Sequence, residues 1–250
     1  MHSYLVRTAV ALGAAAAMLS VAIPAQAQDS PPRRRGIVEV DQLANPRWLL
    51  GITAMLARPT GEFREFVDWG GGLGIYATYH FDEGRHIGLR LDGSHLVYGH
   101  ERFSAPLSTT IPRIGVDVTT SNFITNFGIG PQINFARGPV RPYVYGTVGF
   151  SYFATVSSVS GDDDVVEFAS DTNFDDVTGA VTFGGGLLLQ FNGGNHPVSL
   201  DLAVQSTHNG EATYLRRGGI TDLPDGTVLI RPIESDANLV NFRLGIAIGL

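Results

Sequence analysis

Residues 240–250, VNFRLGIAIGL, alternate strictly between two kinds of side chain. The even-numbered positions are all large and apolar, whereas the odd-numbered positions are polar or small, Asn241 and Arg243 among them. Successive side chains of a β-strand point to opposite faces, so this pattern predicts a strand with one apolar and one polar face.

The same alternation recurs along the chain in segments separated by turn-forming residues. Gly72 to Phe81, for example, place apolar residues at every odd position and small or polar-tipped residues at every even position. The predicted strands are 48–58, 72–81, 87–94, 122–135, 141–154, 179–191, 198–205 and 240–250. This set predicts eight antiparallel strands joined in chain order.

Short and long connections alternate between these strands. The short turns lie near residues 82–85, 136–139 and 192–195, and each contains glycine or asparagine. The long connections are 59–70, 100–119, 157–176 and 208–236. Because the two kinds alternate, all four long connections must lie at the same end of the sheet.

The distribution of charge indicates which face points outward. One face of six strands is almost free of charge, and the other holds Arg90, Asp92, Gln132, Gln190, Asp201 and Arg243. A soluble lipid-carrier barrel would have the apolar face inside, but short turns at one end and long loops at the other are typical of outer-membrane barrels. Aromatic residues near strand ends suggest interfacial girdles: Tyr79, Phe81, Phe135, Tyr152 and Phe191. The predicted fold is therefore all-β, an eight-stranded antiparallel up-and-down transmembrane β-barrel.

A barrel of eight strands is only wide enough inside for its own side chains, so a general diffusion pore is not expected. We predict that Arg90, Asp92, Asp201 and Arg243 form a polar ion-pair network in the lumen. A narrow gated water path is the alternative.

The N-terminus has the features of a secretory signal peptide. Arg7 precedes an apolar segment, 8–23, and Ala25-Gln26-Ala27 is a small-x-small cleavage pattern. A membrane anchor is the alternative, but about 16 apolar residues are too few for a spanning helix. We expect a signal peptide at 1–27 cleaved after Ala27, a flexible leader at 28–46, and the barrel at 47–250.

Composition excludes several classes of protein. The chain has no cysteine, which excludes disulfide scaffolds, zinc ribbons and thiol catalysis. Its 17 basic residues, all arginine, are outnumbered by 24 acidic ones, so nucleic acid is not an expected partner. No cofactor is expected.

The third long connection is acidic. Asp162, Asp163, Asp164 and Glu167 are the candidate ligands of a calcium ion, which prefers several oxygen ligands. Their spacing does not match an EF-hand, and a solvated acidic loop is the alternative. Metal binding is therefore not the principal expectation.

Together, these features resemble the OmpA/OmpX-like eight-stranded outer-membrane barrels of Gram-negative bacteria, over residues 48–250. The resemblance implies an assembly signal in the last strand. The spacing of this signal is matched by Arg243, Gly245, Ile248 and Leu250. The family prefers aromatic residues at the last two of these positions. The resemblance also implies outer-membrane lipids, the barrel-assembly machinery and periplasmic chaperones as partners, and a monomer. The peptidoglycan-binding domain of full OmpA-type proteins is not expected.

Some outer-membrane barrels are lipid A deacylases or palmitoyltransferases with Ser and His on the wall. Ser206 and His208 share a face here, with Glu211 nearby, but their order differs from the deacylase pattern. The protein is expected not to be an enzyme, and its function is expected to be a structural or surface-interaction role of the four long loops. The alternatives are a narrow transport barrel for a small or hydrophobic solute and a lipid A-modifying enzyme.

Overall fold

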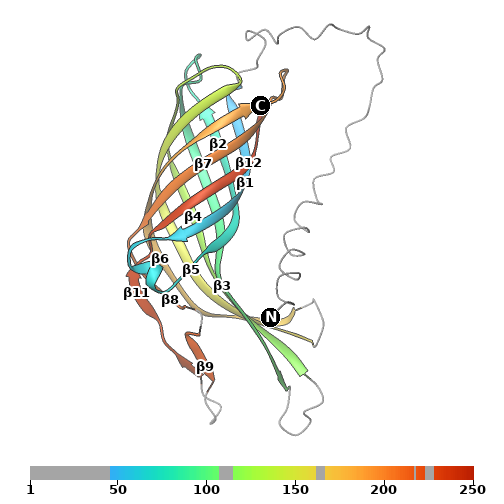
Figure 1. Cartoon of the computed structure of the whole chain (residues 1–250), viewed down its shortest axis with the longest axis vertical. Coiled ribbons are helices and arrows are strands. Elements are labelled where there is room, and N and C mark those ends of the chain that lie inside the picture. The colour runs from blue at the N-terminus through green and yellow to red at the C-terminus, as the bar shows by residue number, and fades with distance from the viewer. Residues whose placement is uncertain (1–45, 107–114, 162–166, 217, 223–227) are drawn as a thin grey trace, which may run out of the picture. The chain divides into compact units, whose positions relative to one another are not determined.

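A computed structural model describes residues 46–106, 115–161, 167–216, 218–222 and 228–250. Eight antiparallel strands close into a barrel in the order β1-β12-β7-β6-β5-β4-β3-β2 (Figure 1). The strands are β1 (Trp48–Pro59), β2 (Gly70–His80), β3 (Ile87–Pro106), β4 (Gly115–Asn134), β5 (Val140–Gly161), β6 (Glu167–Gln190), β7 (Val198–Asn209) and β12 (Leu239–Gly249). The predicted fold class is confirmed.

The last strand closes the wall against the first. β12 pairs with β1 from Leu49↔Gly249 to Pro59↔Leu239, and with β7 on its other side. Closure leaves no open edge in the wall, so its backbone polar groups are hydrogen-bonded within the sheet. No helix in the described part of the chain is long and apolar enough to cross a membrane.

The apolar side chains of the wall point outward and the polar side chains point inward. In β12, Phe242 and Leu244 are exposed, whereas Asn241 and Arg243 are buried. The outward face of β1 runs from Trp48 to Arg58, and ten residue steps at a rise of about 3.3 Å and a tilt of about 40° span roughly 25 Å. This is the height of the apolar band of an outer-membrane barrel.

The short turns use residues suited to tight reversal. The carboxylate of Asp82 accepts hydrogen bonds from the backbone N–H groups of His86 and Ile87, at 3.0 and 2.8 Å. These two bonds, the one from Ile87 being the stronger, lower the pKa of Asp82 to about 2. Gly138 and Gly194 adopt positive φ angles of 126° and 101° in the other two turns.

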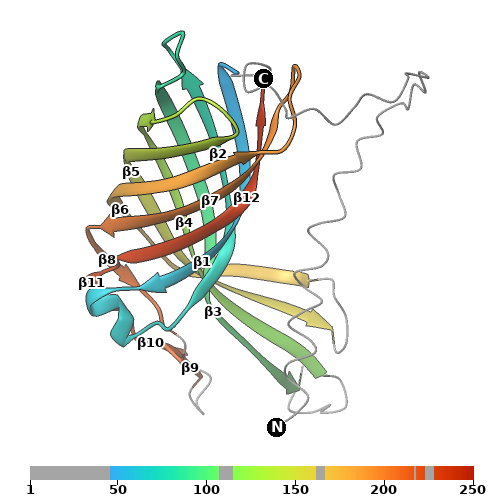
Figure 2. The ribbon, with the colours of Figure 1, turned by 45° about the horizontal axis from the view of Figure 1, so that its top comes forward.

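Two of the predicted long connections are largely strand. β3 continues beyond its last pair with β2, at Val97, and stays paired with β4 to Pro106↔Gly115. β5 and β6 likewise stay paired to Ser160↔Glu167. We call the part of these four strands beyond the barrel wall the sheet extension: residues 98–106, 115–122, 155–161 and 167–179 (Figure 2). Both faces are rich in Ser, Thr and Asp there, so no apolar face marked these segments as strands.

The other two long connections hold short elements. The first contains a 3₁₀ helix, η3 (Gly61–Glu65), and the last contains two small sheets. These sheets pair β8 (Glu211–Tyr214) with β11 (Ile233–Asp236) and β9 (Ile220–Asp222) with β10 (Val228–Ile230).

Candidate functional site

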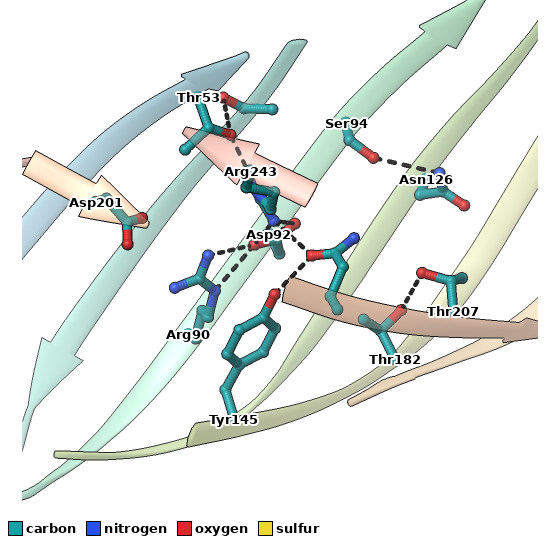
Figure 3. A network of polar contacts seen from close by, with 12 residues as sticks. Thr53, Arg90, Asp92, Ser94, Asn126, Tyr145, Thr182, Asp201, Thr207 and Arg243 are labelled. Carbon is teal, nitrogen blue, oxygen red and sulfur yellow. Dashed lines mark hydrogen bonds and ion pairs between the residues drawn. The ribbon is translucent and has the colours of Figure 1, made fainter. Parts of the chain in front are cut away.

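An ion-paired cluster occupies the middle of the lumen. The carboxylate of Asp92, on β3, accepts hydrogen bonds from Arg90 on the same strand and from Arg243 on β12, with shortest distances of 2.7 and 2.8 Å (Figure 3). Arg243 also donates to Gln205 at 2.8 Å and to Thr53 at 3.1 Å. One buried carboxylate therefore joins two buried cations.

Aromatic rings hold the guanidinium of Arg90 in place. It lies 3.7 Å from the ring centre of Tyr76 and 4.2 Å from that of Tyr145. Cation–π contacts of a desolvated cation contribute about 2 kcal/mol each. Glycines on the neighbouring strands leave room for the two rings. A Cβ at Gly51 would overlap Tyr76, and a Cβ at Gly184 would overlap Tyr145.

The network continues toward the end with the short turns. Arg90 donates to the side-chain oxygen of Gln132 at 3.0 Å, and Gln132 donates to Asn134 at 3.0 Å. Asn134 in turn donates to Nε2 of His80 at 2.7 Å. A chain of hydrogen bonds therefore runs from the middle of the lumen to the end with the short turns.

The structure brings together three of the four residues predicted for the lumen network. Asp201 lies apart: one of its oxygens accepts a hydrogen bond from the hydroxyl of Tyr143 at 2.7 Å, and the other has no hydrogen-bond partner in the described part of the chain. It forms no ion pair with any described residue. Arg90 and Arg243 both donate hydrogen bonds to the carboxylate of Asp92 instead.

An apolar cluster closes the lumen at the end with the long connections. Phe63, from η3, packs edge-on against Tyr214 of β8, with ring centres 4.9 Å apart. Other buried side chains surround this pair. We call the whole cluster the apolar plug: Met55, Ala57, Phe63, Val67, Leu96, Ile124, Phe153, Ala212, Tyr214, Ala237 and Leu239. No local pattern in the sequence predicts this plug, because its members come from two separate connections and from several strands of the wall.

The plug and the polar network leave little free space. A cavity beside Asp92, below the plug, has a volume of about 10 Å³ and is lined mainly by polar groups such as Ser94, Asn126 and Thr182. That volume holds about one water molecule. The side chains beside Asp92 are therefore closely packed.

The sheet extension carries an ion pair of its own. Arg102 on β3 contacts Asp117 on β4 at 2.5 Å, and the hydroxyl of Ser104 donates to the same carboxylate. The hydrogen bonds from Ser104 and Arg102 lower the pKa of Asp117. Because the guanidinium side chain is half exposed, the pair contributes little to the free energy of unfolding.

The extension ends in open strand edges. Residues 98–106 of β3 pair with β4 only, and residues 167–175 of β6 pair with β5 only. Near the wall the β6 edge is covered, since Asp176 accepts a hydrogen bond from the backbone N–H of Thr213 and Gly179 from that of Gly210. In the described part of the chain, neither segment pairs with a second strand.

Ser206 and His208 lie together on the outward face of β7. The serine hydroxyl is 3.1 Å from Nε2 of His208, and both residues are at least partly exposed. Glu211 begins β8, is exposed and forms no hydrogen bond with His208. Among the described residues no carboxylate orients the imidazole, which a serine nucleophile activated by histidine requires.

The remaining predicted residues are placed as follows. Asp162, Asp163 and Asp164 lie outside the described residues, and Glu167 begins β6. No group of three potential ligands that could hold a metal ion occurs in the described part of the chain. The predicted signal peptide and nearly all of the leader, at 1–45, also lie outside it.

The predicted assembly signal lies on the strand that closes the barrel. Arg243 points into the lumen, and Ile248 and Leu250 are exposed on the outside. A Cβ at Gly245 would overlap the backbone of β1 at Ile52, so glycine permits close approach of β12 to β1.

Comparison with known proteins identifies related sequences and folds. The model of the outer membrane protein β-barrel domain family matches residues 13–196. Among solved structures, the attachment invasion locus protein Ail of Yersinia pestis is 14% identical, with a TM-score of 0.42, over 83% of this chain and 100% of that chain. Neisserial surface protein A is 13% identical, with a TM-score of 0.43, over 81% and 97%. A major outer membrane protein of Thermus thermophilus is 13% identical, with a TM-score of 0.38, over 80% and 98%. No curated protein matches the sequence.

Proposed function

This chain belongs to the outer membrane protein β-barrel domain family, and from that premise we propose that it binds an extended protein segment at the cell surface through its sheet extension. The observation that carries the proposal is that two strand edges, 98–106 of β3 and 167–175 of β6, pair with no second strand in the described part of the chain. Long unpaired strand edges bind further strands through backbone hydrogen bonds. The long connections of outer-membrane barrels lie on the extracellular side, so these edges would face outside the cell.

The packed lumen favours a surface function over transport. A transported solute would have to pass both the apolar plug and the Arg90–Asp92–Arg243 cluster, and the cavity beside Asp92 holds about one water molecule. A narrow transport barrel is therefore the weaker candidate.

A lipid-modifying function rests on the hydrogen bond between Ser206 and His208 alone. The pair lies on the outward face, where it would meet lipid, but it lacks an orienting acid among the described residues. A fluorophosphonate probe that labels the folded barrel, with loss of labelling in Ser206→Ala, would support this candidate instead.

A variant with a shortened sheet extension, which we call the trimmed barrel, tests the surface function. Residues 100–121 and 156–173 are each replaced by a two-residue Asn-Gly turn, which joins strands that are already paired at Gly99↔Asn122 and at Thr155↔Phe174. The trimmed barrel should still fold, because the wall, the lumen network and the plug are retained. Its boiled and unboiled samples should therefore migrate differently on a gel. Binding of extended peptides from an immobilised library, and adhesion of cells that display the protein, should be lost.

A matched control shortens the β9–β10 hairpin at 220–230, which pairs with no strand of the extension. This variant should bind and adhere as the intact chain does. If the trimmed barrel folds and retains full binding and adhesion, the edges are not the binding surface and the proposal fails.

A further inference from the structure

Arg141 is a buried cation that forms no ion pair with any described residue. It is the second residue of β5, and only 5% of its surface is exposed. One of its terminal nitrogens donates to the hydroxyl of Ser199 at 3.3 Å, and its Nε has no hydrogen-bond partner among the described residues. In contrast, Arg90 and Arg243 each contact the carboxylate of Asp92.

The charges of the lumen do not balance. The buried charged residues of the described barrel wall are three arginines, at 90, 141 and 243, and two aspartates, at 92 and 201. Asp92 is shared by Arg90 and Arg243, and Asp201 bonds to Tyr143, so no described carboxylate pairs with Arg141. A buried cation without a counter-charge costs several kcal/mol.

Arg141 lies at the end of the barrel with the short turns, which we call the mouth. It shares this mouth with neutral side chains at the ends of neighbouring strands, among them His80, Gln190 and Ser199. Asn134 donates to Nε2 of His80 while Nδ1 of His80 faces the carbonyl of Arg47, which is the bonding pattern of a neutral imidazole. The side-chain oxygen of Gln190 is unpartnered. The mouth is therefore polar and carries the positive charge of Arg141.

We propose that this mouth is a phosphate-binding site, in which Arg141 binds the oxyanion and the hydroxyl of Ser199 is a second donor. A guanidinium presents two parallel N–H groups that fit two oxygens of a phosphate group, and the bond strengthens where water is excluded. The ligand enters from the periplasmic side, because the Arg90 cluster and the plug close the other direction. The phosphate belongs either to a soluble periplasmic molecule or to the headgroup of an anionic phospholipid.

The experiment measures the thermal unfolding of the mature chain folded in zwitterionic micelles, with inorganic phosphate replacing chloride at constant ionic strength. At a phosphate concentration ten times the dissociation constant, mass action lowers the unfolding equilibrium constant about elevenfold. A second arm replaces phosphate by phosphatidylglycerol in the micelles. A response to inorganic phosphate identifies a soluble ligand, and a response to the lipid alone identifies a headgroup.

The response should vanish in Arg141→Gln and persist in Arg137→Gln, which removes an exposed arginine from a neighbouring turn. The Nε–H resonance of Arg141 gives a second measurement in the unmutated chain, and it should shift with ligand while those of Arg90 and Arg243 stay unchanged. Absence of a response in both arms, or an equal response in Arg141→Gln, overturns the proposal. These outcomes are independent of the sheet extension.

Discussion

Asp92 and Arg243 are 151 residues apart in the sequence and 2.8 Å apart in the lumen. Their contact connects the third strand of the barrel to the last strand across the interior. Because Asp92 also accepts hydrogen bonds from Arg90, its carboxylate is the counter-charge of two buried arginines.

Replacing Asp92 with Asn should destabilise the folded barrel by about 3–5 kcal/mol, because two buried arginines lose their counter-charge. The matched control is Asp201→Asn, in which the amide oxygen can still accept the hydrogen bond from Tyr143, so the loss should be about 1 kcal/mol or less. Urea unfolding in micelles, followed by heat-modified migration on a gel, measures both. Equal losses in the two variants would contradict a central role of Asp92.

Gly184→Ala should destabilise the barrel by about 1–3 kcal/mol, because the added methyl group overlaps the ring of Tyr145, which packs against Arg90. Gly179→Ala lies on the same strand and has open space around the added methyl group. It should leave the unfolding midpoint unchanged. If the two variants unfold alike, the ring is not confined as the structure indicates.

Phe63→Ala should cost about 3–5 kcal/mol, because it removes the ring at the centre of the apolar plug. It should nevertheless not open a pore, since the Arg90–Asp92–Arg243 cluster still fills the lumen. Planar-bilayer recordings should show no steady conductance in either the variant or the unmutated chain. Stable single-channel steps from the unmutated chain would favour a transport function.

The turn at Asp82 predicts a pH dependence of stability in acid. The pKa of Asp82 in the folded chain, about 2, lies below the ordinary value of 3.8. Its stabilising contribution is therefore complete above the ordinary value and is lost as the pH falls from about 4 to about 2. In Asp82→Asn the unfolding midpoint should be lower at neutral pH and should change less over this interval. An unaltered pH profile in that variant would show that the turn makes no such contribution.

The sequence by itself determined the wall of the barrel. Alternation of the kind seen in residues 240–250 assigns each side chain to the lipid or to the lumen, because the two-residue period of a strand is a local property. It also predicted the inward direction of Arg90, Asp92 and Arg243. The same signal failed at 98–106 and 167–179, where polar residues on both faces leave no period to detect.

Only the tertiary structure decided which inward side chains meet. Barrel closure and strand register bring Arg243 to Asp92 and leave Asp201 with Tyr143, and these distances depend on all eight strands together. The plug has the same origin, since Phe63 and Tyr214 are joined by packing of two connections over the lumen. That no described carboxylate pairs with Arg141 is likewise invisible in sequence, because it depends on the space around the residue.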